Sequence, residues 1–98
     1  RDVTAEQIKM QAATYFGVSL DDLEGPSRSK TLVSARQVAM YLCRELTDLS
    51  LPAIGAEFGN RDHTTVMHAD RKIRKNIGES RRLYEQVADL TNRIKTSN

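Results

Sequence analysis

The residues from Leu51 to Ile77 restrict the fold of this chain more than any other stretch. Leu51, Ile54 and Phe58 are spaced for one face of a short helix, and Gly59 can end that helix because glycine adopts a left-handed backbone at little cost. A longer apolar pattern resumes a few residues later. Two helices joined by a tight turn that contains glycine form a helix-turn-helix, which is the arrangement that this stretch predicts.

The second of these helices is predicted to bury one stripe of side chains and to expose another. At about 100° per residue, its apolar residues fall within one sector of roughly 80°, and they are Val66, Ala69, Ile73 and Ile77. The opposite side carries hydroxyls, an imidazole and cations, on Thr64, Thr65, His68, Arg71, Lys72 and Lys75. Asp62 precedes the helix, and its carboxylate is placed to cap the helix by accepting a backbone N–H near Thr65.

The rest of the chain is also predicted to be helical. Thr4 and Gln7 have the spacing of a capping box for a helix over residues 5–16. Ser19 is placed to cap a single turn, a third helix is expected from Ser34 to Leu46, and a final helix follows Ser80. No strand-like alternation persists along the sequence. We therefore expect an all-α fold of five or six helices.

The charges of the chain are unevenly distributed. Residues 1–25 hold two basic and five acidic side chains, whereas residues 26–82 hold eleven basic and six acidic ones. The formal net charge is only +2 because the acidic leader offsets the basic centre. A localised basic region indicates an anionic partner such as nucleic acid, although solvated surface charge would give the same count.

A short polar loop, PSRSKT over residues 26–31, carries Arg28 and Lys30 at its tip. Such a loop can be a simple connector. Beside a recognition helix it can instead be an arm that enters the minor groove of DNA, where narrow A·T-rich tracts attract arginine. Thr, Asp and His side chains suit the base edges of the major groove, and long cations suit phosphates. The polar face of the helix after Asp62 therefore predicts DNA recognition.

The sequence offers little support for catalysis or metal binding. His63 and His68 are five residues apart, which turns their side chains away from each other on a helix, and Cys43 is the single cysteine. The chain has no H-E-x-x-H pattern, no G-x-S-x-G elbow and no G-x-x-x-x-G-K-S/T phosphate loop. We therefore predict that this chain is not an enzyme and holds no metal or cofactor.

The run GNRDHTTVMHADRKI, from Gly59 to Ile73, closely resembles the signature of the C-terminal DNA-binding domain of the DnaA family, the bacterial chromosomal replication initiators. Upstream, ARQVAMYLCRELTDLSLPAIGAEFG also resembles the two preceding helices of that family. The resemblance implies a six-helix domain with a helix-turn-helix in a Trp-repressor-like arrangement. It implies binding to short asymmetric DnaA boxes in double-stranded DNA at the replication origin. It also implies that the family's ATP site lies in a separate AAA+ domain.

The resemblance further implies a division of roles among the contact residues. The residues expected to read bases are Arg28 in the minor groove, Asp62, His63 and Thr64 in the major groove, and Pro52 on a thymine methyl group. The residues expected on the phosphate side, some through main-chain N–H groups, are Gln37, Arg44, Leu51, Thr65, His68 and Lys72, with Lys30 and Arg36 as weaker candidates.

Residues 1–98 are expected to form one domain from the C-terminal end of a longer chain, because the sequence begins at Arg1 rather than Met. No apolar run is long enough to span a membrane, and a cytoplasmic, nucleoid-associated protein is expected. The asymmetric DNA site, together with the lack of a second apolar face, favours a monomer. Two alternatives stay open: a dimeric helix-turn-helix transcriptional repressor, and a cationic module that binds an acidic protein.

Overall fold

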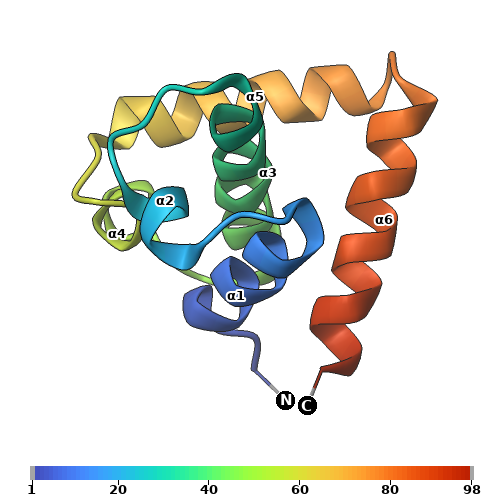
Figure 1. The fold of residues 1–98 in the computed structure, drawn as a ribbon, viewed down its shortest axis with the longest axis horizontal. Helices are drawn as coiled ribbons and strands as arrows, with labels where there is room; N and C mark the ends of the chain where they lie inside the picture. The colour runs from blue at the N-terminus through green and yellow to red at the C-terminus, as the bar shows by residue number, and fades with distance from the viewer. Residues whose placement is uncertain (1, 98) are drawn as a thin grey trace.

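The centre of the fold is α3, a helix of 17 residues from Lys30 to Leu46. In the computed structural model, which describes residues 2–97, four other helices pack against α3 (Figure 1). Along the described residues the elements are α1 (Ala5–Phe16), α2 (Leu20–Glu24), α3 (Lys30–Leu46), α4 (Leu51–Glu57), α5 (His63–Ile77) and α6 (Arg81–Thr96), with no strand among them. The prediction of an all-α fold is confirmed. Arg1 and Asn98, which the predicted domain includes, lie outside the described residues.

Short polar side chains begin several helices where the sequence predicts them. Thr4 and Gln7 form the capping box: the Gln7 N–H donates to Thr4 Oγ1 at 3.1 Å, and the Thr4 N–H donates to Gln7 Oε1 at 2.9 Å. The hydroxyls of Ser19, Ser50 and Ser80 each accept a backbone N–H from the residue three positions on. Such a cap stabilises a helix by about 1 kcal/mol.

The third helix begins four residues before its predicted start at Ser34. Ser29 caps α3 by accepting the Leu32 N–H at 3.3 Å, so Lys30 is the first residue of the helix and not part of the loop. Ser29 provides this acceptor locally, and no glycine or proline follows Pro26 to delay the helix. The connection between α2 and α3 is therefore the short α2–α3 loop of residues 25–29.

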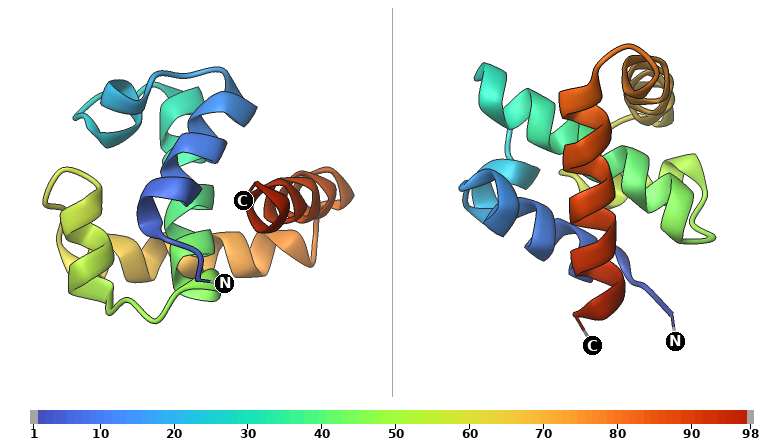
Figure 2. Two further views of the ribbon diagram at one scale, coloured as in Figure 1. Left: turned by 90° about the horizontal axis from the view of Figure 1, so that it is seen from below. Right: turned by 90° about the vertical axis from the view of Figure 1, so that its right-hand side faces the viewer.

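The core lies between α3, α1, α5 and α6. Of the predicted stripe on α5, Val66, Ala69 and Ile73 are buried and Ile77 is half-buried against the core. α5 packs mainly on α3 and α4. α6 turns back from the end of α5 and packs on α1 (Figures 1 and 2). The buried apolar residues on α3 are Leu32, Ala35, Val38, Ala39, Met40, Leu42 and Cys43, and those on α6 are Val87, Leu90 and Ile94. Burial raises the pKa of the Cys43 thiol to about 12.

The buried ammonium of Lys9 joins three helices, and the sequence gives no sign of this role. Its Nζ donates to Glu24 Oε2 on α2 at 2.8 Å, and to Glu57 Oε1 on α4 at 2.9 Å. It also donates to the carbonyl of Glu57 at 2.9 Å. Burial acts to lower the pKa of Lys9, but the hydrogen bonds to both carboxylates outweigh burial and raise that pKa above its ordinary value. Lys9 thereby holds α2 and α4 side by side on α1.

Two glycines, Gly55 in α4 and Gly59 in the turn between α4 and α5, have no room for a side chain. Gly59 and Asn60 both have left-handed backbones, with φ of 73° and 58°, as predicted for Gly59. The Arg61 N–H donates to the Gly55 carbonyl at 2.9 Å. A Cβ at Gly55 would overlap the Arg61 carbonyl oxygen, and a Cβ at Gly59 would overlap the carbonyl oxygen of Glu24 at the end of α2. The turn is therefore pressed against both α4 and α2.

Replacing Gly55 by Ala is expected to destabilise the domain by at least about 2 kcal/mol, because the new methyl group meets a backbone atom that cannot rotate away. Gly78→Ala is the matched control, since Gly78 has a helical backbone and a Cβ there meets only an ordinary contact at 3.4 Å. Urea denaturation followed by circular dichroism measures both. Equal stabilities for the two variants would contradict the tight packing of the turn.

Candidate nucleic-acid interface

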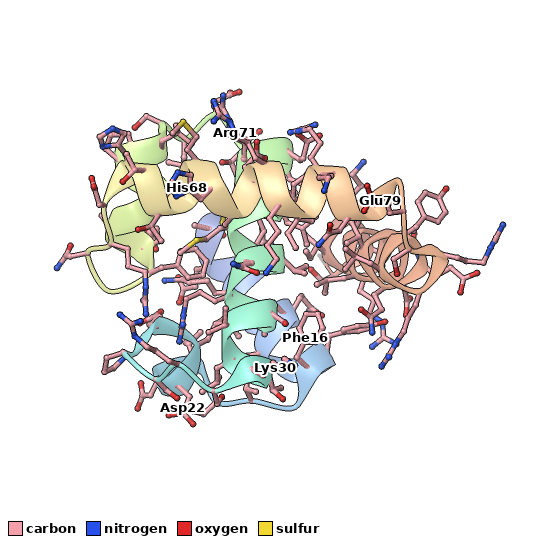
Figure 3. All side chains as sticks on the ribbon, turned by 90° about the horizontal axis from the view of Figure 1, so that it is seen from above. Phe16, Asp22, Lys30, His68, Arg71 and Glu79 are labelled. Atoms are coloured by element: carbon pink, nitrogen blue, oxygen red, sulfur yellow. The ribbon has the colours of Figure 1, made fainter. Side chains whose placement is uncertain are left out.

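One face of the molecule combines α5 with the α2–α3 loop. Figure 3 looks onto this face, where α5 crosses in front of α3 and Lys30 marks the start of α3 beside the loop. His68 and Arg71 lie on the α5 side of this view. Arg28 of the loop and Thr65 of α5 line one hollow between the two elements. The loop and α5 are therefore two neighbouring ridges on a single surface.

The polar stripe of α5 lies on the surface, as the angular count predicts. Asp62, His63, Thr65, His68 and Lys72 are exposed. Thr64 is half-buried at the start of the helix. The short polar side chains therefore gather at the N-terminal end of α5 and the long cations follow further along, which suits a helix that enters the major groove by its N-terminus.

Asp62, His63 and Thr64 form a small hydrogen-bonded network at that end. The Thr64 hydroxyl donates to Asp62 Oδ2 at 2.7 Å, and His63 Nδ1 lies 3.0 Å from Asp62 Oδ1. The bond from Thr64, with the neighbouring His63, holds the pKa of Asp62 below its ordinary value. An ionised Asp62 can only accept hydrogen bonds. With its hydroxyl hydrogen engaged, Thr64 offers its methyl group and its oxygen lone pairs to a ligand.

A second hollow brings α3 and α5 together further along the same face. It is lined by Gln37 and Arg36 of α3, by Arg61 of the turn, and by Thr65 and His68 of α5, among others. Four residues that the sequence assigns to phosphate contacts therefore meet in one place: Gln37, Thr65 and His68, with Arg36 as the weaker candidate. Lys72 follows His68 by one helical turn and is exposed.

Three other predicted contact residues lie where α3 ends and α4 begins. Arg44 is exposed in the last turn of α3. Leu51 and Pro52 open α4 directly after the Ser50 cap. Pro52 has no N–H and the Ala53 N–H donates to Ser50 Oγ at 3.2 Å, so the Leu51 N–H is the group at this helix start that is placed for a phosphate oxygen.

Four of the predicted contact cations carry charges that are not paired within the described part of the domain. Arg28, Lys30, Arg44 and Lys72 have no acidic side chain within ion-pair distance among residues 2–97. Cations that do have such partners are Lys9, Arg74, Lys75, Arg81 and Arg93. The unpaired charges are free to meet an anion without first breaking an ion pair.

Arg74 illustrates a cation of α5 that serves the fold instead. Its Nη2 donates to Glu45 Oε2 on α3 at 2.6 Å and to Asp70 Oδ1 at 3.1 Å. Its guanidinium also lies over the ring of Tyr41, 5.4 Å from the centroid. Arg74 therefore ties α5 to the C-terminal half of α3.

Comparison with known sequences decides the family of this helix-turn-helix. Residues 5–73 match the family described as the bacterial DnaA protein helix-turn-helix. The chain belongs to the DnaA family. The chromosomal replication initiator protein DnaA of Cutibacterium acnes is 68% identical over 93 residues, which are 95% of this chain and 19% of that protein. The DnaA of Corynebacterium jeikeium is 48% identical over 95 residues, which are 97% of this chain and 16% of that protein.

The chain thus spans less than a fifth of the DnaA relatives that it matches. The matched part is the helix-turn-helix domain, a binding domain and not a catalytic one. Within residues 2–97, no helix is both long and apolar enough to cross a membrane. The same residues contain no group of three or more His, Cys, Asp or Glu side chains placed to hold a metal ion.

In the structure, the Asp62 side chain does not cap α5 as the sequence predicts. Asp62 occupies the N-cap position with an extended backbone, but its side chain makes no capping hydrogen bond. Its two oxygens are taken by Thr64 and His63 instead, and the Thr65 N–H donates to the Asp62 carbonyl at 3.0 Å. The side-chain neighbours compete with the backbone for the same carboxylate. The carboxylate therefore faces outward with its neighbours.

Arg36, a weaker candidate among the predicted phosphate contacts, differs from the other candidates because it is buried. Its side chain is buried, with the residue only 6% exposed, and it donates to three backbone carbonyls. Three of its five N–H groups donate to these carbonyls, which makes Arg36 first a residue of the fold. The sequence could not distinguish Arg36 from its exposed neighbours because the carbonyls come from residues 22–27, which are brought to it only by the fold.

Arg61 is a residue of the turn that the sequence reasoning missed. It lies inside the resembling run but carries no assigned contact. In the structure its guanidinium is half-buried and donates to the carbonyls of Glu24, Gly25 and Phe58. The one sequence signal was its place between a glycine turn and a helix start, where backbone carbonyls commonly need donors.

Removing the Asp62 side chain tests the corrected cap. Asp62→Ala is expected to change stability by about 0.5 kcal/mol or less in 0.5 M NaCl, where salt screens its interaction with the helix dipole. Ser80→Ala is the control, since Ser80 Oγ accepts the Leu83 N–H at 3.2 Å, and its loss is expected to cost about 1 kcal/mol. Urea denaturation measures both. A larger loss for Asp62→Ala than for Ser80→Ala would restore the capping role.

Proposed function

We propose that this domain binds DnaA boxes in double-stranded DNA, with α5 in the major groove and Arg28 in the minor groove. In this proposal Asp62, His63 and Thr64 read base edges, and Pro52 contacts a thymine methyl group. The phosphate contacts come from Lys30, Gln37, Arg44, Leu51, Thr65, His68 and Lys72. Arg36, buried against backbone carbonyls, is not among them.

The observation that carries the proposal is the arrangement of α5 and the α2–α3 loop as two ridges on one face. A major groove is wide enough to admit an α-helix, and an adjacent minor groove can admit an arginine from an arm. Arg28 is exposed on the loop and has no acidic partner among the described residues. One molecule can thereby contact both grooves, and it can do so as a monomer because the two ridges differ.

Within a longer DnaA chain, such a domain would deliver the protein to the replication origin in the bacterial cytoplasm. The relatives that it matches are named as chromosomal replication initiators. ATP binding, in this proposal, belongs to a different part of those longer chains. The domain itself, residues 1–98, acts by binding alone.

A selection from random duplexes tests the function directly. The domain is immobilised and bound DNA is amplified over several rounds at fixed salt, because affinities depend strongly on salt. Enrichment of one short asymmetric sequence is expected. Enrichment of a palindrome, together with a dimer in size-exclusion chromatography, would favour the repressor alternative. Equal binding to every duplex and to an acidic polypeptide would favour a cationic protein-interaction module.

Thr64→Ala is expected to lose discrimination at one base pair of the selected box, by about 1–3 kcal/mol, because the methyl group and lone pairs that face the groove disappear. Fluorescence anisotropy with a set of boxes, each changed at one base pair, measures the loss of discrimination. Thr14→Ala is the control, because Thr14 is an exposed threonine on α1, and this variant should keep the full pattern of discrimination. If Thr64→Ala weakened box and scrambled DNA equally, the base-reading role of Thr64 would be wrong.

Lys72→Gln is expected to weaken all duplexes similarly and to reduce the slope of log K against log salt by about 1, as the loss of one phosphate contact requires. Lys95→Gln on α6 is the matched control, since Lys95 is also exposed and lies on a different helix. Titrations at four salt concentrations provide the slopes. An unchanged slope for Lys72→Gln would remove Lys72 from the phosphate contacts.

A further inference from the structure

The C-terminal end of α2 leaves carbonyl groups that its own helix cannot satisfy. α2 has only five residues, and the chain leaves it through Gly25 with an extended backbone and not a left-handed cap. The last carbonyls of any helix need donors from elsewhere. The Gly25 N–H donates to the Asp22 carbonyl at 3.2 Å. The other donors are two arginine side chains from distant elements, Arg36 of α3 and Arg61 of the turn before α5.

Arg36 holds both sides of the α2–α3 loop. Its Nε donates to the Leu23 carbonyl at 2.7 Å and its Nη2 to the Asp22 carbonyl at 3.0 Å. Its Nη1 donates to the carbonyl of Ser27, directly before Arg28, at 3.1 Å. One planar guanidinium therefore fixes the end of α2 and the loop residue that precedes the predicted minor-groove arginine.

Arg61 joins the same loop to the helix-turn-helix. Its Nη2 donates to the Gly25 carbonyl at 2.6 Å, and its Nη1 lies 3.2 Å from the Glu24 carbonyl oxygen. The same Nη1 donates to the Phe58 carbonyl at 2.6 Å, inside the turn. The backbones on either side also touch closely, because a Cβ at Gly59 would overlap the Glu24 carbonyl oxygen.

The two guanidinium groups lie close to each other as well as to the carbonyls. Burial, and after it the charge of Arg61, lowers the pKa of Arg36 from its ordinary value. Guanidinium groups nevertheless remain charged in proteins. Two like charges side by side oppose folding, so the carbonyl oxygens are needed to offset both the repulsion and the burial. Losing either arginine leaves carbonyls without donors and loosens the loop.

We propose that Arg61, with Arg36, is a positioning residue for DNA recognition: the pair clamps the α2–α3 loop to the helix-turn-helix, so that Arg28 and α5 meet DNA at a fixed separation. This inference rests on the proposed function, since it assigns Arg28 to the minor groove. Neither arginine touches DNA in this account. Without the clamp the loop would be mobile, and Arg28 would occupy many positions. DNA binding would then have to order the loop at an entropic cost.

Arg61→Lys separates charge from geometry. Lysine keeps the positive charge, but its single ammonium group cannot reproduce the fork that reaches Gly25, Glu24 and Phe58 together. Arg36→Lys is a second variant, which loosens the loop without touching the turn. Arg81→Lys on α6 is the matched control, because the Arg81 side chain is 84% exposed and pairs with Glu85 on its own helix. Thermal unfolding confirms that each variant is folded before it is used.

The first measurement is made on free protein and does not depend on DNA. Backbone ¹⁵N relaxation reports the order of Ser27, Arg28 and Ser29 on the picosecond-to-nanosecond timescale, with order parameters near 0.85 for rigid backbone and below about 0.6 for flexible backbone. Both clamp variants are expected to lower the order of these three residues, while the middle of α5 and Arg81→Lys are unaffected. An ordered loop in both variants would overturn the proposal.

The second measurement separates the two grooves. Replacing adenine by 2,6-diaminopurine adds an amino group to the minor groove and leaves the major groove unchanged, whereas replacing thymine by uracil removes a methyl group from the major groove alone. In the unmodified protein, diaminopurine at the A·T pair that Arg28 contacts in the minor groove is expected to weaken binding at least about fivefold. That loss of affinity should fall to less than about twofold in three variants, Arg28→Ala, Arg61→Lys and Arg36→Lys. The loss of affinity caused by uracil in the major groove should stay the same in all three.

The outcomes distinguish the inference from the function on which it rests. If Arg61→Lys and Arg36→Lys keep the full diaminopurine penalty while Arg28→Ala loses it, the clamp does not position Arg28 and the inference fails. If the unmodified protein prefers no duplex, the proposed function fails instead. If the clamp variants lose both kinds of penalty together, the arginines support the whole fold and not the arm, which also overturns the proposal.

Discussion

The burial of the α5 stripe against α3 is the interaction on which the rest of this structure depends. A helix of 15 residues is marginal alone in water. Val66 and Ile73 are largely removed from solvent, and each such side chain contributes about 1.5–3 kcal/mol. This burial fixes the rotation of α5 about its own axis. The opposite stripe, from Thr64 to Lys72, then faces outward without any further interaction to aim it.

Charged side chains hold the parts of the domain that have too few apolar residues to hold themselves. α2 buries only Leu23, yet it is tied to α1 by Lys9, to α3 by Arg36 and to the turn by Arg61. Burying an ion is costly unless all its hydrogen bonds are made. Within residues 2–97, every buried side-chain nitrogen and oxygen has a partner. These ties therefore favour one arrangement over alternatives, because a displaced loop would leave its carbonyls without donors.

Most of the helices, and the division of α5 into a buried and an exposed face, follow from the sequence alone. Helix existence, caps such as Thr4 and Ser19, and the two faces of α5 depend on local spacing, and the structure places them as predicted. The Arg36 and Lys9 interactions could not be predicted, because their partners come from residues 9 to 48 positions away. The Asp62 side chain was assigned as a cap because spacing cannot weigh two competing hydrogen-bond partners against the backbone.

The crowded turn at Gly55 and Gly59 also limits how a domain of this kind can diverge. Neither glycine can gain a side chain without moving a backbone carbonyl of α2 or of the turn itself. The backbone of the turn is therefore held close to α4 and to the end of α2. A lineage that came to prefer a different DNA sequence would have to exchange side chains on an unchanged scaffold. Variation should concentrate in a few exposed positions, while the backbone geometry around them is conserved.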